Sequence, residues 1–234
     1  MLLKISQLLG PEEVSQILHT LTQAPQGEGW QDGRATAGTQ GAQVKNNQQM
    51  PEHSATTAQA RSVVVSTLAK NAQFMSGALP KRIYPPSFNR YTQGSNAFGT
   101  HIDNAVRSVP AVGSVGGYLR TDLSCTVFLS APESYDGGEL VIQSPSGDQV
   151  FKLATGDMLL YPANTLHRVN AVTRGQRIAS FFWVESLVAN NERRQLLYEL
   201  DMAIYSLRGA YGDNAETVRL TGVYHNLLRM WAQT

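Results

Sequence analysis

The chain has 234 residues, enough for one large domain or for one domain with a small appendage. Hydrophobic residues make up 42% of the chain and charged residues only 16%, so a sizeable core is feasible and disorder is not expected. The formal net charge is +1, without a long run of one sign, which argues against nucleic acid or an anionic membrane surface as a partner.

The single cysteine, Cys125, excludes an intrachain disulfide and suits a reducing compartment. It lies in an apolar run, 123–129, which predicts a small buried hydrophobe. No apolar stretch approaches the length of a membrane span, and the first residues lack a signal-peptide pattern. These observations together predict a cytoplasmic protein that does not associate with a membrane.

The first third of the chain mixes short elements with polar segments. A strand is expected over 1–7, a helix from Pro11 and a second helix over about 55–72. Between them, the Gly-rich stretch 26–41 carries Trp30, which either anchors a loop on the core or faces a substrate. The polar segment 43–49 is either a solvated turn or a strand and loop that aim amides at a substrate.

From about residue 78 to 184 the pattern changes to short strands separated by turn signals such as Asp136-Gly137-Gly138. Many short strands without crossover helices indicate a sandwich or jelly roll. The expected strands are 78–84, 88–91, 98–102, 119–129, 138–142, 148–152, 158–161, 167–172 and 176–184.

After Val184 the spacing of apolar residues becomes helical, over 191–207, ended by Gly209, and over 214–231. We therefore divide the chain into residues 1–184, with a β core over about 78–184, and a helical C-terminal region over 185–234. The helices are expected to pack either on the protein's own barrel or on a second copy in a homodimer, with Met230 and Trp231 as anchors.

His101 and Asp103 are the first candidate metal ligands. Residues i and i+2 of a strand share a face, so an imidazole and a carboxylate can lie side by side. A distant His167 can complete a set of two nitrogens and one oxygen, which leaves open positions on iron(II). An isolated His-x-Asp is weak evidence, because such a pair also occurs by chance in exposed loops and turns.

Arg177, ten residues after His167, strengthens this hypothesis. Alternation places it on one strand face with Ala179, Phe181 and Trp183, where a surface charge is hard to explain and a buried cation needs a partner. A ligand carboxylate, such as the C5 carboxylate of 2-oxoglutarate, can be that partner. A non-catalytic metal-binding jelly-roll sensor is the alternative, although it has no need for such a clamp. A third reading is an interaction protein that assembles through its helical tail.

At these residues the chain resembles the prolyl 4-hydroxylase-type iron/2-oxoglutarate dioxygenases, and more closely the bacterial PKHD-type hydroxylases. The resemblance covers nearly the whole chain and is specific in the combination of its motifs. The matching segments are Asn89-Arg90-Tyr91, His101-Ile102-Asp103-Asn104, Asp136-Gly137-Gly138-Glu139-Leu140, Gly156-Asp157, His167-Arg168-Val169, Gly175-Gln176-Arg177, the Val44-Lys45-Asn46-Asn47-Gln48 segment and the helical tail.

The resemblance implies a double-stranded β-helix core with Fe(2+) on His101, Asp103 and His167, and with Arg177 binding 2-oxoglutarate. Tyr91 matches a phenol near the cosubstrate, and it can equally be a buried core tyrosine. Phe128 stands where some eukaryotic prolyl hydroxylases have a second cosubstrate-binding tyrosine, so that contact is expected to be absent or supplied elsewhere.

The resemblance further implies hydroxylation coupled to decarboxylation of 2-oxoglutarate to succinate and CO2, with L-ascorbate as a reductant. The sequence does not identify the substrate, which can be peptidyl, siderophore-like or another small molecule. The regions around Trp30, 46–49 and 104–117 are expected to line the entrance.

Overall fold

The computed structural model describes residues 1–112 and 115–234, and within these it leaves out the side chains of 110–112 and 115–116. Its larger sheet has eight strands, of which β5 (Pro80–Ile83) pairs with the end of one long strand, β17. The other seven follow one another in the order β1 (Leu3–Ile5), β14 (Met158–Pro162), β10 (Leu123–Phe128), β17 (Gln176–Ser186), β6 (Ser87–Thr92), β4 (Gln48–Gln49) and β2 (Gln31–Asp32).

A smaller sheet packs against the larger one. Apolar side chains from both sheets form one buried cluster, which includes Tyr91 and Phe128 from the larger sheet and Ile142 and Val169 from the smaller. The strand order of the smaller sheet is β13 (Gln149–Phe151), β12 (Leu140–Ile142), β15 (His167–Val169), β7 (Ala97–His101) and β3 (Lys45–Asn46). Two further pairs are β8 (Val106–Val112) with β9 (Val115–Arg120), and β11 (Asp136–Gly137) with β16 (Val172–Arg174).

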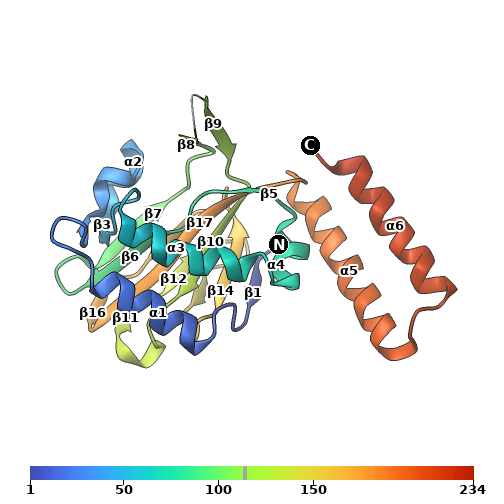
Figure 1. Ribbon diagram of the computed structural model, residues 1–234, viewed down its shortest axis with the longest axis horizontal. Coiled ribbons are helices and arrows are strands. Elements are labelled where there is room, and N and C mark those ends of the chain that lie inside the picture. Colours follow the sequence, from blue (N-terminus) through green and yellow to red (C-terminus); the bar gives the residue numbers. More distant parts are fainter. Residues whose placement is uncertain (113–114) are drawn as a thin grey trace.

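Helices cover the outer face of the larger sheet. Helices α1 (Pro11–Thr22) and α3 (Ala55–Leu68) lie over this sheet in Figure 1, and their buried residues join those of β10 and β17 in the main core. Along β10, Cys125 and its alternate neighbours pack in this core, as expected for the cysteine, whereas Ser124 and Thr126 line a cavity on the other face. This jelly roll with flanking helices is the predicted fold class.

The structure differs from the expected elements at several places, and one of them is the strand expected over 167–172, which is divided into β15 and β16. The helix expected over 55–72 ends at Leu68, and Asn71 caps a separate helix α4 (Ala72–Ala78) by accepting a hydrogen bond from the Phe74 amide. The strand expected over 119–129 is interrupted at residues 121–122. Its first part joins the hairpin β8–β9, which we did not predict.

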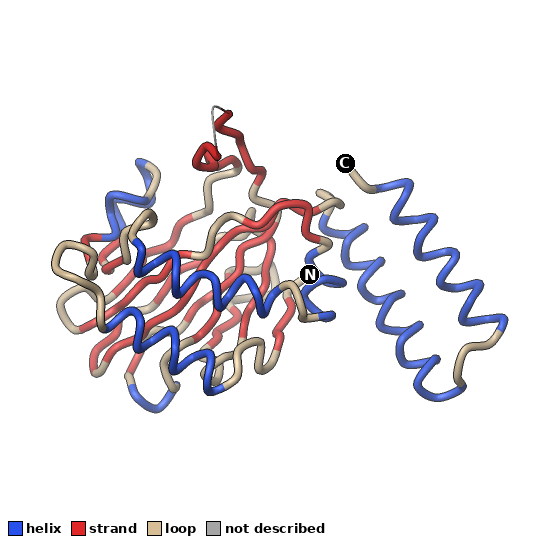
Figure 2. The backbone as a smooth tube through the Cα atoms, viewed as in Figure 1, coloured by secondary structure: helices blue, strands red, loops and turns tan. Residues whose placement is uncertain are grey.

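The two C-terminal helices form a hairpin to one side of the sheets, as the blue helices of Figure 2 show. Helix α5 (Asn191–Tyr211) continues through Gly209 and ends at Gly212, whose φ of 71° suits glycine. Helix α6 (Ala215–Trp231) packs back along it. None of the described helices is long and apolar enough to cross a membrane.

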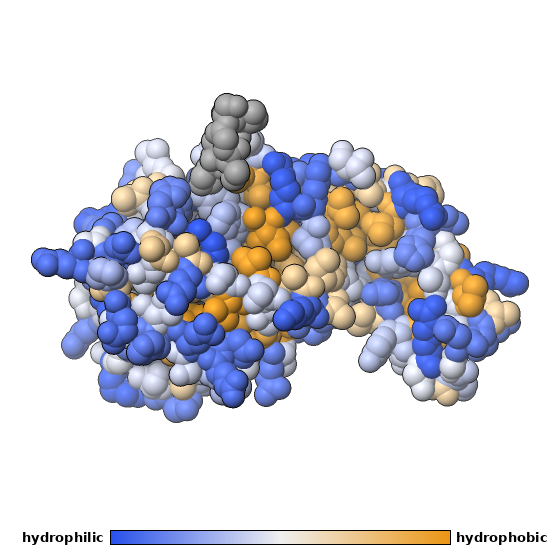
Figure 3. All heavy atoms as spheres, viewed as in Figure 1, coloured by the Kyte–Doolittle hydropathy of each residue, from blue (hydrophilic) through white to orange (hydrophobic). Residues whose placement is uncertain are grey.

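The hairpin packs on the core through a small apolar cluster and a polar junction. Leu197 and Trp231 join Leu79 and Val188 in that cluster, whereas Met230 is 74% exposed. Hydrophobic residues also gather on the face shown in Figure 3, where the hairpin meets the core. The apolar stripe of α5 is therefore partly covered by the protein's own core.

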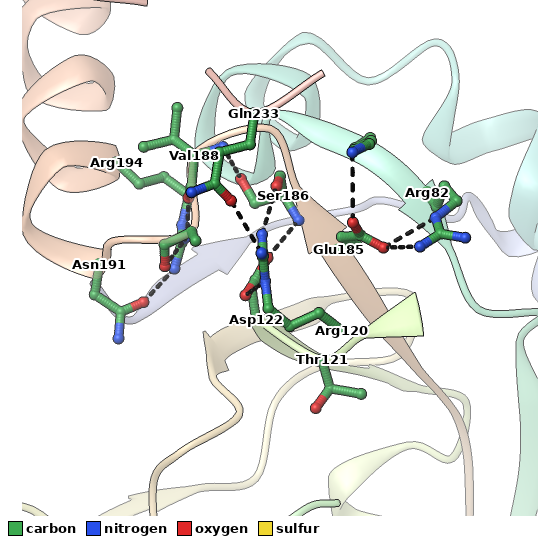
Figure 4. A network of polar contacts seen from close by, with 12 residues as sticks. Arg82, Arg120, Thr121, Asp122, Glu185, Ser186, Val188, Asn191, Arg194 and Gln233 are labelled. Atoms are coloured by element: carbon green, nitrogen blue, oxygen red, sulfur yellow. Dashed lines mark hydrogen bonds and ion pairs between the residues drawn. The ribbon is translucent and has the colours of Figure 1, made fainter. Parts of the chain in front are cut away.

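The polar junction is shown in Figure 4. Asp122 accepts hydrogen bonds from the Ser186 amide at 2.8 Å and from Arg120. The buried guanidinium of Arg194 donates to the carbonyl of Val188 at 2.6 Å, and also to Ala189 and Asn191. Arg194 thus satisfies the carbonyls of the turn that leads from β17 into α5. Additional short elements are α2 (Thr39–Val44) and the 3-10 turns η1 (Gly33–Thr36) and η2 (Pro132–Ser134).

We predict that Arg194→Met lowers the free energy of unfolding by about 1–3 kcal/mol, because it leaves the buried Val188 carbonyl and the partly buried Ala189 carbonyl without this donor. Urea unfolding followed by circular dichroism measures this change. The control is Arg219→Met, which removes an exposed arginine from the same hairpin. Equal unfolding midpoints for the two variants would contradict this role of Arg194.

Candidate metal centre and cosubstrate pocket

His101 and His167 meet across two neighbouring strands. They are direct partners in the pairing of β7 with β15, and their ring centroids lie 4.2 Å apart. The strand β7 ends at His101, so Asp103 reaches the same place from the following turn and not from a continuous strand. One ligand atom from each of the three residues lies within 4.8 Å of the other two.

Hydrogen bonds orient both imidazoles toward a common point. His101 Nδ1 contacts the Gly99 carbonyl at 2.8 Å, and His167 Nδ1 contacts the Thr165 carbonyl at 2.9 Å. Each Nε2 is left to ligate a metal. Burial, and then the neighbouring His167, lowers the pKa of His101 to about 4, so its ring is neutral near pH 7 and can ligate.

Sequence reasoning missed a residue that fixes the carboxylate. Ser124 on β10 donates a hydrogen bond of 2.5 Å to Asp103 Oδ2, which lies 3.8 Å from His167 Nε2. Ser124 thereby limits rotation of the Asp103 carboxylate. The only signal was a serine that alternates with apolar residues inside a strand buried on both faces.

Arg177 is almost fully buried and carries unused donors. It is 1% exposed, and its guanidinium carbon lies 5.2 Å from the Tyr91 ring centroid and 5.3 Å from that of Phe128. Within the described part of the chain, its Nε and Nη1 have no hydrogen-bond partner. A buried guanidinium with free donors fits a carboxylate brought by a ligand.

Tyr91 lies beside Arg177, because these two residues are paired between β6 and β17. It is 1% exposed and lines the cavity, and burial raises the pKa of its hydroxyl. The Phe128 ring faces the same guanidinium without offering a donor. Sequence reasoning missed Tyr135, which directly precedes β11 and lies near Arg177. A Cβ on Gly138 would come within 2.9 Å of Tyr135 and 3.1 Å of Arg177, and its φ is +68°, so this position needs glycine.

The metal candidates and Arg177 open on one cavity of about 360 Å³, within the usual range for a small-molecule site. Phe181 and Trp183 line it together with Arg177, as strand alternation predicted. Trp30 is not among the lining residues. It packs on the main core, and the guanidinium carbon of Arg90 lies 4.9 Å from its ring centroid. Trp30 therefore anchors a loop.

The polar segment 43–49 is not a solvated turn. Lys45 and Asn47 are 7% and 2% exposed, and both line the cavity. From the expected entrance region 104–117, Asn104 and Arg107 also line it. Residues 113 and 114 of that region lie outside the described residues.

Two family models match the chain. Residues 86–185 match the 2OG-Fe(II) oxygenase superfamily, and residues 191–233 match the PKHD-type hydroxylase C-terminal domain. A PKHD-type hydroxylase of Saccharophagus degradans is 52% identical over 234 residues, and the match covers 100% of each chain. Another, of Pseudoalteromonas atlantica, is 51% identical over 233 residues and covers 99% of each chain.

Solved structures support the fold. A Pseudomonas putida prolyl-4-hydroxylase has a TM-score of 0.52 at 15% identity and covers 79% of this chain and 92% of its own. A Trichoplax adhaerens prolyl hydroxylase, in complex with a hypoxia inducible factor oxygen degradation domain peptide, has a TM-score of 0.58 at 13% identity, covering 84% and 86%. The architecture and the full-length relatives agree, and the chain therefore belongs to the PKHD-type hydroxylases, a group of 2-oxoglutarate-dependent dioxygenases in the 2OG-Fe(II) oxygenase superfamily.

Proposed function

We propose that this dioxygenase hydroxylates a carbon of its substrate while it converts 2-oxoglutarate to succinate and CO2. One atom of dioxygen enters the substrate hydroxyl and the other enters the new carboxylate of succinate. The observation that carries the proposal is the buried Arg177 guanidinium with unused donors, which opens on the same cavity as the three candidate ligands.

His101, Asp103 and His167 would hold iron(II), and this nitrogen and carboxylate donor set fits that metal. When bound, the iron supplies the redox chemistry that activates dioxygen. Ser124 holds the Asp103 carboxylate in place, and Arg177 anchors the C5 carboxylate of 2-oxoglutarate, so the 2-oxo acid end is directed at the metal. Tyr91 offers a hydroxyl beside the same cosubstrate.

L-ascorbate is the reductant we propose, returning iron to the iron(II) state after unproductive turnover. We place the enzyme in the cytoplasm, since its single cysteine is free and buried. The substrate is a small molecule or a peptidyl group. A non-catalytic metal sensor is the weaker alternative, because it gives no reason for a buried arginine with unused donors at the cavity.

The C-terminal hairpin carries our proposal of a homodimer. Its described surface exposes more large apolar side chains than a solvated hairpin needs, and we propose that a second copy covers some of them. These are Leu196, Tyr205, Leu207, Tyr211, Val218, Val223 and Met230.

We predict that His101→Ala, Asp103→Ala and His167→Ala each abolish tight iron(II) binding and turnover, because each removes one of three ligands. Anaerobic dialysis followed by metal analysis measures the bound iron. His19→Ala, at an exposed histidine of α1, is the control and should bind one equivalent. Full activity in two of the three ligand variants would falsify the assignment.

Arg177→Ala should weaken 2-oxoglutarate binding by about two to three orders of magnitude while iron stays bound, since losing one partner of a buried charge pair costs about 3–5 kcal/mol. An anaerobic titration followed by the metal-to-ligand absorption band measures the affinity. Arg174→Ala, at an exposed arginine paired with Asp136, should leave the affinity unchanged. Unchanged affinity in Arg177→Ala would rule this role out.

The homodimer should dissociate when Val218 and Met230 are both replaced by glutamate, because a charge is costly in an apolar contact. Light scattering coupled to size exclusion measures the mass at several protein concentrations. The unaltered protein should show the dimer mass. A monomer at all concentrations would contradict the dimer, although the packing of α5 on the core would stand.

A further inference from the structure

Lys45 is a buried cation close to the metal site that the proposed reaction does not use. It lies on β3, whose pairing with β7 sets it directly beside Phe98. Its Nζ lies 5.3 Å from the Phe98 ring centroid, and that ring stacks on the His101 imidazole with centroids 3.5 Å apart. One aromatic ring therefore separates the Lys45 ammonium from a candidate metal ligand.

The partners of this ammonium are all neutral. Nζ donates to Thr36 Oγ1 at 3.0 Å and to the Gln49 side-chain oxygen, and it forms no ion pair within the described part of the chain. An ammonium has three N–H donors, so one donor remains after these two bonds. A buried charge without a counter-charge is costly. Burial, and then the cation of Arg107, lowers the pKa of Lys45 to about 8.

The net charge of the cavity lining also favours an anionic occupant. Among its described lining residues the cations are Lys45, Arg107 and Arg177, and the carboxylates are Glu52 and Asp103. Iron(II) and the dianion of 2-oxoglutarate cancel one another, so the loaded cavity keeps one positive charge. An occupant with a single negative charge would balance it.

Arg107 differs from Lys45 in having a carboxylate counter-charge, although its Nε has no hydrogen-bond partner among the described residues. Its guanidinium lies 3.8 Å from Glu52 and stacks on Tyr84 and Trp183, with its carbon 4.6 Å and 4.1 Å from their ring centroids. Arg177 is assigned to the cosubstrate. Of the three lining cations, Lys45 is therefore the one with neither a carboxylate counter-charge nor an assigned ligand.

We propose that Lys45 binds a carboxylate of the substrate, so that the enzyme selects carboxylic acids with an apolar carbon frame. The frame would lie against Phe98, Phe181 and Trp183, which line the same cavity. This inference rests on the proposed function and adds to it the chemical class of the substrate.

Benzoate and benzamide test this inference, because they have nearly the same shape and differ in charge. Their binding is measured by calorimetry on protein loaded with Mn(II) and 2-oxoglutarate, which occupies Arg177. Benzoate should bind at least about tenfold more tightly than benzamide, as a charge-assisted hydrogen bond requires. Lys45→Met should remove this preference, and Lys45→Arg should keep it.

Lys70→Met removes an exposed lysine and should behave like the unaltered protein. Loading of each variant with Mn(II) and 2-oxoglutarate is measured first, which shows that the cavity of Lys45→Met is intact. Equal affinities for the two probes, a preference that persists in Lys45→Met, or no binding of either probe would overturn the inference. Failure of the unaltered protein to load would instead contradict the proposed function itself.

Discussion

The buried guanidinium of Arg177 is the constraint on which the account of the site depends. A permanent charge at 1% exposure needs compensation, and its Nε and Nη1 have no acceptor in the described part of the chain. The rings of Tyr91 and Phe128 give partial compensation through their faces, which is worth less than a carboxylate. The site thus contains a buried positive charge that needs the negative charge of a ligand. This favours a site that binds an anionic cosubstrate over a site that binds a metal alone.

The packing of the two sheets brings Arg177 and the candidate metal ligands to one cavity. The smaller sheet brings His101 and His167 into register, and the larger sheet contributes Arg177 and Ser124 from neighbouring strands. Ser124 donates a hydrogen bond to the Asp103 carboxylate, so a candidate ligand that follows the smaller sheet is held by a strand of the larger one. The positions of the candidate metal ligands and of Arg177 therefore depend on the same core packing.

Sequence patterns predicted what is local and periodic. Alternation along residues 177–183 placed Arg177, Ala179, Phe181 and Trp183 on one face. Arg177, Phe181 and Trp183 line the cavity, whereas Ala179 is not among its lining residues and Phe182 is. The turn predicted at residues 136–138 is instead the short strand β11 followed by a loop, although Gly137 and Gly138 do adopt positive φ. Same-face spacing also suggested the ligand set and a carboxylate partner for Arg177, and the resemblance to a family implied the same residues and roles.

What the sequence could not reveal depends on distant pairing. Ser124 acquires its role only because β10 lies under Asp103, and Lys45 becomes buried only because β3 pairs with β7. The break at Asn71 was missed because a capping asparagine competes with an otherwise continuous helical pattern. Gly209 was read as a helix end, although the solvent-exposed position in α5 tolerates glycine at a cost of only about 1 kcal/mol.

We propose that Arg177 binds the distal carboxylate of a 2-oxo diacid. The most direct measurement compares 2-oxoglutarate with 2-oxopentanoate, which has the same chain length but a methyl group in place of that carboxylate. Anaerobic titration of the iron(II)-loaded protein gives both dissociation constants. The account predicts that 2-oxopentanoate binds about two to three orders of magnitude more weakly, because it leaves the buried cation without its partner. Equal affinities for the two acids would contradict the account.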